Sequence, residues 1–347
     1  MEIPSREPKK RKIIMIPGQG FQYKNMGRRM VQKFPIAEEH YEIAKEKTGL
    51  SMDQLLMHPN AKMTLLSILA GCVTFSCAQM EVRKELEEEK GLEPRITQEE
   101  NEELYWAGFS AGMYGGVLGS GTLDFEKLME LIARRAECMS QIVYDKPCML
   151  KIVGRFAELE QILLKYGVEK ALEHAHDIVM AGGEPSDVEI AHKIIVDMGV
   201  NAKPVKGVVA PFHTRAYKWI AQRVFAPVLK RVPFRVPREG RIISNVTADA
   251  LTGDPKELRK DLADHLWHPV RWAQIVERWA YNLIEHPYIP GARIKNPNPA
   301  ETLAVVMGPG GGYFIKLMER AGYRVNVLDL SDERKLENTK SQYVGAL

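Results

Sequence analysis

The stretch Leu104-Tyr105-Trp106-Ala107-Gly108-Phe109-Ser110-Ala111-Gly112 determines how the chain can be interpreted. Its first four residues form a short apolar run typical of a buried strand, and a helical pattern follows Gly112. A serine between two glycines at a strand-to-helix junction is typical of a nucleophile turn, because the crowded backbone excludes Cβ atoms on either side. We therefore interpret Ser110 as a candidate nucleophile, with the backbone N–H of Ala111 directed at a developing oxyanion.

Alternating strand and helix patterns on both sides of this stretch predict an α/β protein. From residue 148 the elements become short and alternate closely, so residues 148–208 are a candidate small inserted domain. The expected strands are Ile13–Ile16, Met149–Val153, Ile178–Met180, Ala202–Val208 and Arg241–Asn245, and the expected helices are 61–90, Phe125–Met139, Ala157–Tyr166, Asp187–Met198, 214–231 and 256–266.

The composition is that of an ordinary globular protein. Of the 347 residues, 45% are hydrophobic and 27% are charged, which argues against a disordered or fibrous chain. No uninterrupted run of about 20 apolar residues occurs, so we expect no membrane-spanning segment, and no secretory signal is expected either. The cysteines form no CxxC pair, which favours reduced, buried thiols in a cytoplasmic protein over disulfides or a zinc site. They are Cys72, Cys77, Cys138 and Cys148.

The charge is concentrated at one end of the chain. The net charge is +3, and residues 1–12 account for all of it, so residues 13–347 are balanced. We interpret residues 1–12 as a flexible basic tail, with a nuclear address at Pro8–Lys12 as the alternative. A balanced body argues against a nucleic-acid-binding protein, which needs a basic face.

A serine nucleophile needs a base, and nine histidines compete for that role. We favour His213, which lies in Ala210-Pro211-Phe212-His213-Thr214 between a strand-like run and a helix. His174 and His176 form an H-x-H pair, but no further ligands complete it, so we expect no metal site.

Two other motifs have alternative interpretations. Arg134-Arg135 is either a solvated helix face or places one guanidinium where it can bind a substrate carboxylate, and the spacing does not decide between them. The glycines from Gly308 to Gly312 follow a strand and precede Asp329 by about 20 residues, as in a dinucleotide-binding fingerprint. Tyr313 at the third glycine position and the short remainder of the chain argue against that fingerprint.

In their order along the chain, these motifs resemble the malonyl-CoA:acyl carrier protein transacylases. That family includes the acyltransferase domains of fatty-acid and polyketide synthases, and the resemblance covers residues 13 to about 330. The motifs that carry it are Ile16-Pro17-Gly18-Gln19-Gly20, Gly108–Gly112, Arg135–Met139, Pro211-Phe212-His213, Ile243–Thr247, His268–Trp272 and Gly308-Pro309-Gly310.

The resemblance implies an α/β-hydrolase-like large domain, made of residues 13–147 and 209–347, with an inserted ferredoxin-like small domain at residues 148–208. The Gly308-Pro309-Gly310 turn is then structural.

The resemblance also implies the roles of individual residues. Ser110 and His213 would form a catalytic dyad, and a backbone carbonyl near Val270-Arg271 would orient the histidine. Gln19 and the Ala111 N–H would form the oxyanion hole. Arg135 would bind the substrate carboxylate. The substrate-pocket residues would be Phe109, Met113, Phe212 and Asn245, and Phe212 resembles the form that favours malonyl over branched groups.

The implied reaction moves malonyl from malonyl-CoA to the phosphopantetheine thiol of an acyl carrier protein through a malonyl-serine intermediate. No metal or organic cofactor is expected, and no nucleic-acid or membrane partner. Two alternatives use the same dyad: a stand-alone acyltransferase for another acyl group in polyketide biosynthesis, and an acyl-thioester hydrolase. A catalytically inactive scaffold would leave the intact set of serine, histidine, glutamine and arginine unexplained.

The sequence departs from the family pattern at the site and in two segments. Phe109 and Met113 stand where the family usually has histidine and glutamate, so we expect a more apolar site mouth. Residues 91–103 and 285–302 look like insertions. The second is Pro-rich and is interpreted as an inert surface loop, with a partner surface or lid as the alternative.

Overall fold

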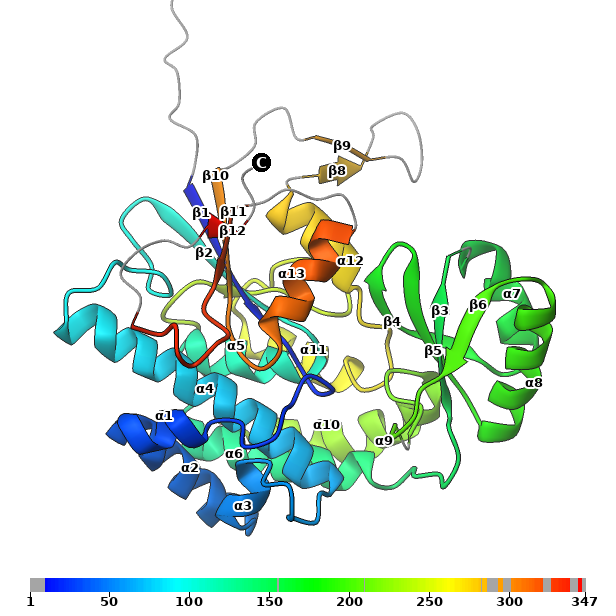
Figure 1. Ribbon diagram of the computed structural model, residues 1–347, viewed down its shortest axis with the longest axis horizontal. Helices are drawn as coiled ribbons and strands as arrows, with labels where there is room; N and C mark the ends of the chain where they lie inside the picture. Colours follow the sequence, from blue (N-terminus) through cyan, green and yellow to red (C-terminus); the bar gives the residue numbers. More distant parts are fainter. Residues whose placement is uncertain are drawn as a thin grey trace, which may run out of the picture.

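The computed structural model describes residues 10–154, 156–208, 210–281, 283–285, 293–295, 301–320, 326–337 and 343–344. Its main sheet has six strands in the order β12-β11-β10-β1-β2-β7 (Figure 1). All neighbouring strands in it are parallel except β11 and β12, which confirms the predicted α/β class. The strands are β1 (Lys10–Ile16), β2 (Glu102–Gly108), β7 (Arg241–Ile242), β10 (Glu301–Val306), β11 (Asn326–Asp329) and β12 (Tyr343–Val344).

Strand β1 is buried on both faces at the centre of this sheet. Ile14 and Ile16 belong to the core formed with α2, α4, α5 and α6, whereas Ile13 and Met15 belong to the core formed with α12 and α13. Helices on both faces explain why the strand is a continuous apolar run. The helices of this unit are α1 (Arg28–Lys33), α2 (Pro35–Thr48), α3 (Met52–Leu55), α4 (Leu65–Glu89), α5 (Met113–Gly119), α6 (Phe125–Met139), α9 (Lys218–Ile220), α10 (Ala226–Arg231), α11 (Pro255–Asp264), α12 (Trp272–Ile275) and α13 (Gly311–Arg320).

A second, antiparallel sheet lies beside the first unit, drawn in green in Figure 1. Its strand order is β4-β5-β3-β6, and its chain order is β-α-β-β-α-β. Val270 joins it to the rest of the protein, because its N–H donates to Ala171 O (2.9 Å) and its carbonyl accepts from Glu173 N (2.9 Å). The elements are β3 (Met149–Val153), α7 (Phe156–Lys165), β4 (Glu169–Ala175), β5 (Ile178–Gly182), α8 (Pro185–Asp197) and β6 (Asn201–Pro204).

Helix α4 has 25 residues and an 18-residue window of mean hydropathy 1.5. By length and composition alone this helix meets the criterion for a membrane span, a test that a buried core helix also passes. Scattered polar residues interrupt the apolar sequence of α4 but lower its mean hydropathy only slightly. In the fold, 78% of that window is buried, and Leu69, Phe75 and Val82 belong to the main core.

Lys10, Arg11 and Lys12, which we predicted to belong to a flexible basic tail, belong to strand β1 instead. Lys12 is 1% exposed, and its Nζ lies 2.7 Å from the Glu102 carboxylate and donates to two backbone carbonyls of the 91–103 segment. The ion pair compensates the buried charge and fixes this part of the chain. Residues 1–9 lie outside the described residues.

The second proposed insertion, residues 285–302, is described only in part. Strands β8 (Leu283–Glu285) and β9 (Arg293–Lys295) pair in antiparallel fashion, and Glu301 and Thr302 begin β10. The other residues of that segment, and with them its role, lie outside the described residues.

Candidate active site

The turn that carries Ser110 follows β2 and is too crowded for side chains on its two glycines. A Cβ on Gly108 would lie 2.1 Å from Met113 N, and one on Gly112 would lie 2.0 Å from Ile16 O. Ser110 itself has φ 49°, a left-handed conformation that is uncommon outside glycine. The strained turn directs the serine hydroxyl away from the sheet, as the sequence predicts for a nucleophile.

His213 lies within hydrogen-bond distance of this hydroxyl. Its Nε2 is 2.8 Å from Ser110 Oγ, and its Nδ1 is 2.7 Å from the carbonyl oxygen of His265. With Nδ1–H donating to that carbonyl, Nε2 is free to accept the serine proton. His213 also has a positive φ, 62°, and is 3% exposed.

The orienting carbonyl is that of His265, and the expectation that it lies near Val270-Arg271 is wrong. Helix α11 ends at Asp264, and the turn after it passes under His213, where the Leu266 carbonyl accepts the His213 N–H (3.2 Å). The backbone N–H and carbonyl of Val270 are hydrogen-bonded to strand β4, and Arg271 N donates to Asn245 O (3.0 Å).

Burial keeps the imidazole of His213 neutral. Desolvation, assisted by the charge of Arg135, lowers the pKa of His213 to about 3. The neutral ring leaves the Nε2 lone pair available to the Ser110 hydroxyl, but so low a pKa makes the resting imidazole a weak base.

Asn245 holds the turn rather than lining the substrate cleft. Its Oδ1 accepts from Ser110 N (2.8 Å), and its Nδ2 donates to Gly108 O (2.6 Å). The side chain is fully buried, so it fixes the backbone on both sides of Phe109.

A cleft of about 720 Å³ opens at the dyad and contacts both sheets' units. Of the predicted site residues, Gln19, Phe109, Ser110, Phe212 and His213 line it. The other walls are mainly apolar, with a few polar side chains. The apolar wall residues include Ile68, Met139, Met149, Leu172, Ile178, Met180, Val205 and Val208, and the polar ones include Lys151, His174 and Lys206.

The Pro17–Gly20 turn packs directly on the serine turn. A Cβ on Gly18 would lie 2.2 Å from the Phe109 carbonyl oxygen and 3.1 Å from Ala111 N. Gly18, the neighbour of Gln19, therefore lies close to the Ala111 N–H, and Gln19 itself lines the cleft.

The pair Arg134-Arg135 divides into one surface and one buried residue. The side chain of Arg134 is 64% exposed and binds Glu137 at 2.9 Å. Arg135 is 1% exposed, and its guanidinium carbon lies 4.9 Å from the centre of the Tyr114 ring. Its Nε and Nη1 have no hydrogen-bond partner among the described residues. Arg135 itself does not line the cleft, but Met139, one turn further along α6, does.

Only one of the two predicted apolar replacements faces the cleft. Phe109 lines it and packs edge-on against Phe21, Trp272 and Phe314, at ring-centre distances of 6.1, 5.6 and 5.5 Å. Met113 is fully buried in the core formed with α4 and α6 and does not reach the cleft. Its place at the first turn of α5 points its side chain into that core.

His174 is a cleft residue that the sequence interpretation missed. Its ring lies 4.9 Å from that of Phe109, and its Nδ1 is buried without a partner in the described part of the chain. Burial, with Lys151 nearby, lowers the pKa of His174 to about 4. His174 belongs to strand β4, and recognising that strand in the sequence would have drawn attention to it. The charged residues of β4 hide the strand pattern.

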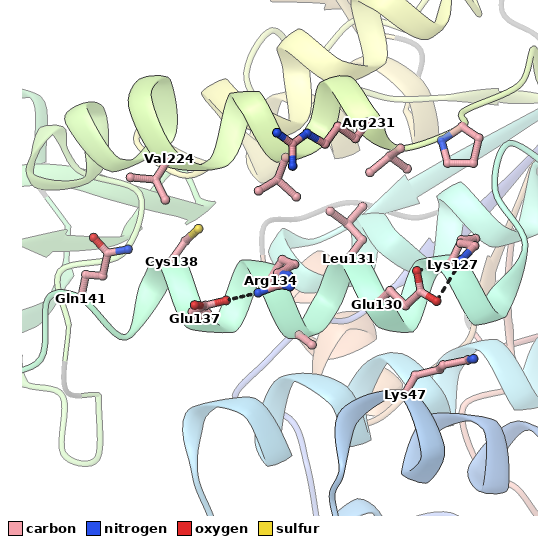
Figure 2. A pocket seen from close by; sticks show the side chains of 14 residues that line it. Lys47, Lys127, Glu130, Leu131, Arg134, Glu137, Cys138, Gln141, Val224 and Arg231 are labelled. Atoms are coloured by element: carbon pink, nitrogen blue, oxygen red, sulfur yellow. Dashed lines mark hydrogen bonds and ion pairs between the residues drawn. The ribbon is translucent and has the colours of Figure 1, made fainter.

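A larger cleft, of about 940 Å³, lies between α6 and the helix that ends in α10 (Figure 2). Its charged walls are partly paired, Lys127 with Glu130 and Arg134 with Glu137, both at 2.9 Å. None of the predicted site residues lines it. The candidate active site is therefore the smaller cleft.

The possible metal site, the four cysteines and the glycine-rich turn at Gly308 provide no second candidate site among the described residues. Among the described residues, no group of three or more His, Cys, Asp and Glu side chains could hold a metal ion. All four cysteines are free and buried, as predicted. The Gly308 turn packs on α4, where Gly308 N donates to Gln79 Oε1 (2.6 Å), and Gly310 and Tyr313 line the smaller cleft beside the dyad.

Comparison with known proteins finds malonyl CoA-acyl carrier protein transacylases and polyketide biosynthesis proteins among the relatives. No family model matches the chain. The malonyl CoA-acyl carrier protein transacylase of Bacillus subtilis (strain 168) is 26% identical over 274 residues, which are 76% of this chain and 81% of that protein. The protein of the same name from Escherichia coli (strain K12) is 26% identical over 289 residues, 80% and 88% of the two chains. The polyketide biosynthesis protein ThaF of Burkholderia thailandensis is 26% identical, but the match covers only 22% of it.

Solved structures of such proteins share the fold. FabD from Acinetobacter baumannii has a TM-score of 0.77 at 20% identity and covers 95% of this chain and 97% of its own. A type II PKS malonyl-transacylase in complex with its acyl-carrier protein has a TM-score of 0.77 at 21% identity, with coverage of 94% and 97%. Sequence relatives and fold therefore agree: the chain is similar to malonyl-CoA:acyl carrier protein transacylases, which are acyltransferase enzymes.

Proposed function

We propose that the chain transfers a malonyl group from malonyl-CoA to the phosphopantetheine thiol of an acyl carrier protein through a malonyl ester of Ser110. The observation that carries the proposal is the 2.8 Å contact between Ser110 Oγ and His213 Nε2, with Nδ1 held by the His265 carbonyl. The names of the sequence relatives supply the substrate and the carrier.

In the first half-reaction, Ser110 Oγ attacks the thioester carbonyl while His213 takes the hydroxyl proton. The Ala111 N–H and Gln19 stabilise the oxyanion of the tetrahedral intermediate. The C–S bond then breaks, and the His213 proton goes to the departing CoA thiolate. In the second half-reaction the carrier thiol gives its proton to His213 and attacks the ester carbonyl. The C–O bond to Ser110 then breaks and His213 returns the proton to Ser110 Oγ, which predicts ping-pong kinetics.

Arg135 binds the free carboxylate of the malonyl group in this proposal. Met139 lines the cleft and Arg135, one turn earlier on α6, does not, so the acyl group must reach beyond the cleft wall to meet the guanidinium. A thioester is already activated, so the reaction needs neither a metal nor an organic cofactor.

The same proposal assigns the parts of the chain. Residues 13–147 and 209–347 form the α/β-hydrolase-like catalytic domain, residues 148–208 form the ferredoxin-like domain, and the cleft lies between them. Lys151 and Lys206 on the second domain give that wall positive charge, which suits an acidic carrier protein or the phosphate of its arm. The four reduced cysteines support a cytoplasmic location.

The test is the mass of the intact protein after brief incubation with malonyl-CoA. We expect an adduct of one malonyl group that is absent in Ser110→Ala, present in the control Ser140→Ala, and lost on addition of a carrier protein that gains the same mass. A Ser110→Ala protein that still forms the adduct would contradict the proposed nucleophile.

Two other functions use the same cleft. The polyketide relatives ThaF and PksE and the apolar walls favour a transferase for another acyl group, which would give an adduct with a different acyl-CoA in the same assay. A thioester hydrolase would release free acid steadily without a carrier protein and would accumulate little adduct.

A further inference from the structure

Three buried polar side chains lie near one another beside the dyad, and we call this cluster of Tyr114, Arg135 and His265 the carboxylate chamber. They come from α5, α6 and the turn after α11, and none is more than 1% exposed. The Arg135 guanidinium carbon lies 4.9 Å from the Tyr114 ring centre, and the His265 ring lies 4.9 Å from the His213 ring.

Each of these side chains has polar atoms without a hydrogen-bond partner among the described residues. They are Tyr114 Oη, Arg135 Nε and Nη1, and both ring nitrogens of His265. Buried polar atoms are normally paired, and a cluster of unpaired ones calls for a bound water or ligand.

The charges show which kind of ligand fits. No carboxylate of the described residues forms an ion pair with Arg135, although a buried, unpaired guanidinium is costly. Burial, together with the positive charge of Arg135 and the neighbouring His213, lowers the pKa of His265, so its ring is neutral and keeps one N–H. Burial raises the pKa of Tyr114, so its hydroxyl keeps its proton. The charge of Asp261 also raises the pKa of Tyr114, and the Asp261 carboxylate accepts a hydrogen bond from Ser244.

The chamber thus offers several N–H and O–H donors and one uncompensated positive charge. A carboxylate accepts about four hydrogen bonds through its two oxygens, so its capacity matches these donors. An uncharged acetyl group would leave them unpaired.

We propose that Tyr114 and His265 act with Arg135 as specificity-determining residues that bind the free carboxylate of a short diacid thioester. The inference rests on the proposed transferase function. His265 borders His213, and His213 contacts Ser110, so the chamber lies one imidazole away from the nucleophile. This arrangement fits an acyl group whose carboxylate is close to its thioester carbonyl, as in malonyl.

The test measures binding of malonyl-CoA and acetyl-CoA by calorimetry in the Ser110→Ala protein, which cannot react. One hydrogen bond to a charged group corresponds to roughly tenfold or more in affinity. Tyr114→Phe keeps the ring under Arg135 and removes only the hydroxyl. We expect this substitution to lower the affinity for malonyl-CoA by about tenfold and the affinity for acetyl-CoA by less than about twofold. His265→Leu should shift the ratio of the two affinities in the same direction, and Arg135→Ala should shift it most.

Tyr41→Phe is the matched control, because the Tyr41 hydroxyl on α2 is also buried without a partner in the described part of the chain. It should leave both affinities unchanged. Equal losses for the two thioesters in Tyr114→Phe, or no loss at all, would overturn the inference, because a structural role or a bound water does not distinguish malonyl from acetyl.

The same experiment separates this inference from the proposed function. If the reactive protein forms no malonyl adduct but the Ser110→Ala protein prefers malonyl-CoA through Tyr114, the transferase assignment fails and the carboxylate chamber stands. If the adduct forms and Tyr114→Phe leaves the preference intact, the chamber fails alone.

Discussion

Replacement of Asn245 by alanine should loosen the serine turn without changing the side chain of either residue of the dyad. The change removes two hydrogen bonds, Oδ1 with Ser110 N at 2.8 Å and Nδ2 with Gly108 O at 2.6 Å. Ser110 is held at φ 49° partly by these bonds, so their loss should let the turn relax away from His213.

The magnitude follows from the burial of the two partners. The Gly108 carbonyl is buried, and leaving it unpaired costs about 1–3 kcal/mol. The Ser110 N–H is partly buried and regains some hydration, so its share is about 0.5–1.5 kcal/mol. Asn245→Ala should therefore lower the free energy of unfolding by roughly 1.5–4.5 kcal/mol.

Urea unfolding measures this loss, and the rate of adduct formation with malonyl-CoA measures the effect on the turn. Asn201→Ala, at an exposed position on β6, is the control and should change stability by less than about 0.5 kcal/mol. If Asn245→Ala were as stable as the control and labelled at the normal rate, the view that Asn245 holds the turn would be refuted.

Four further predictions concern acid–base behaviour and packing. Since His213 has a pKa of about 3, adduct formation should stay independent of pH between about 7 and 5 in a stopped-flow assay, and a fall centred near 6.5 would contradict this. The same shift means that the unfolded state binds the proton first, so stability should fall as pH drops below about 6.5, and His213→Asn should flatten that part of the curve. Burial raises the pKa of Asp261 to about 6, so its ionised form destabilises the fold above that pH; Asp261→Asn should gain about 1–3 kcal/mol in urea unfolding at pH 8 and nothing at pH 4. Gly112→Ala, whose Cβ would lie 2.0 Å from Ile16 O, should lose about 1–3 kcal/mol or more and most of the labelling, whereas Gly312→Ala, with nothing within 4 Å, should lose neither.

Helices and strands that are specified by a local sequence pattern could be predicted from the sequence. Strands that depend on pairing with residues far along the chain could not. Helix α6 and strand β3 have the predicted bounds, because an amphipathic period and an apolar run specify them locally. Strand β4 was missed because its charged residues hide it, and it exists through its pairing with β5 and Val270. Strand β6 is shorter than predicted for the same reason, since its length follows its pairing with β3.

The candidate site divides in the same way. Flanking glycines identify the Ser110 turn, and a junction between elements identifies His213, so both could be found from sequence. Nothing local distinguishes Arg134 from Arg135, because only the packing of α6 decides which of the two is buried. The carbonyl of His265 and the hydroxyl of Tyr114 carry no sequence signal, since the backbone of one and the burial of the other depend on how three helices meet.

The position of β1 has a consequence for the synthesis of the protein. One neighbour, β2, begins at Glu102, but the other, β10, begins only at Glu301. On a ribosome that adds about 5–20 residues per second, one edge of the central strand therefore waits for roughly 10–40 seconds without its partner. That edge is apolar and open to pairing with other chains during this interval. Truncated or stalled chains that end before residue 301 should thus be retained by chaperones or aggregate, even though Ser110 and His213 have already been made.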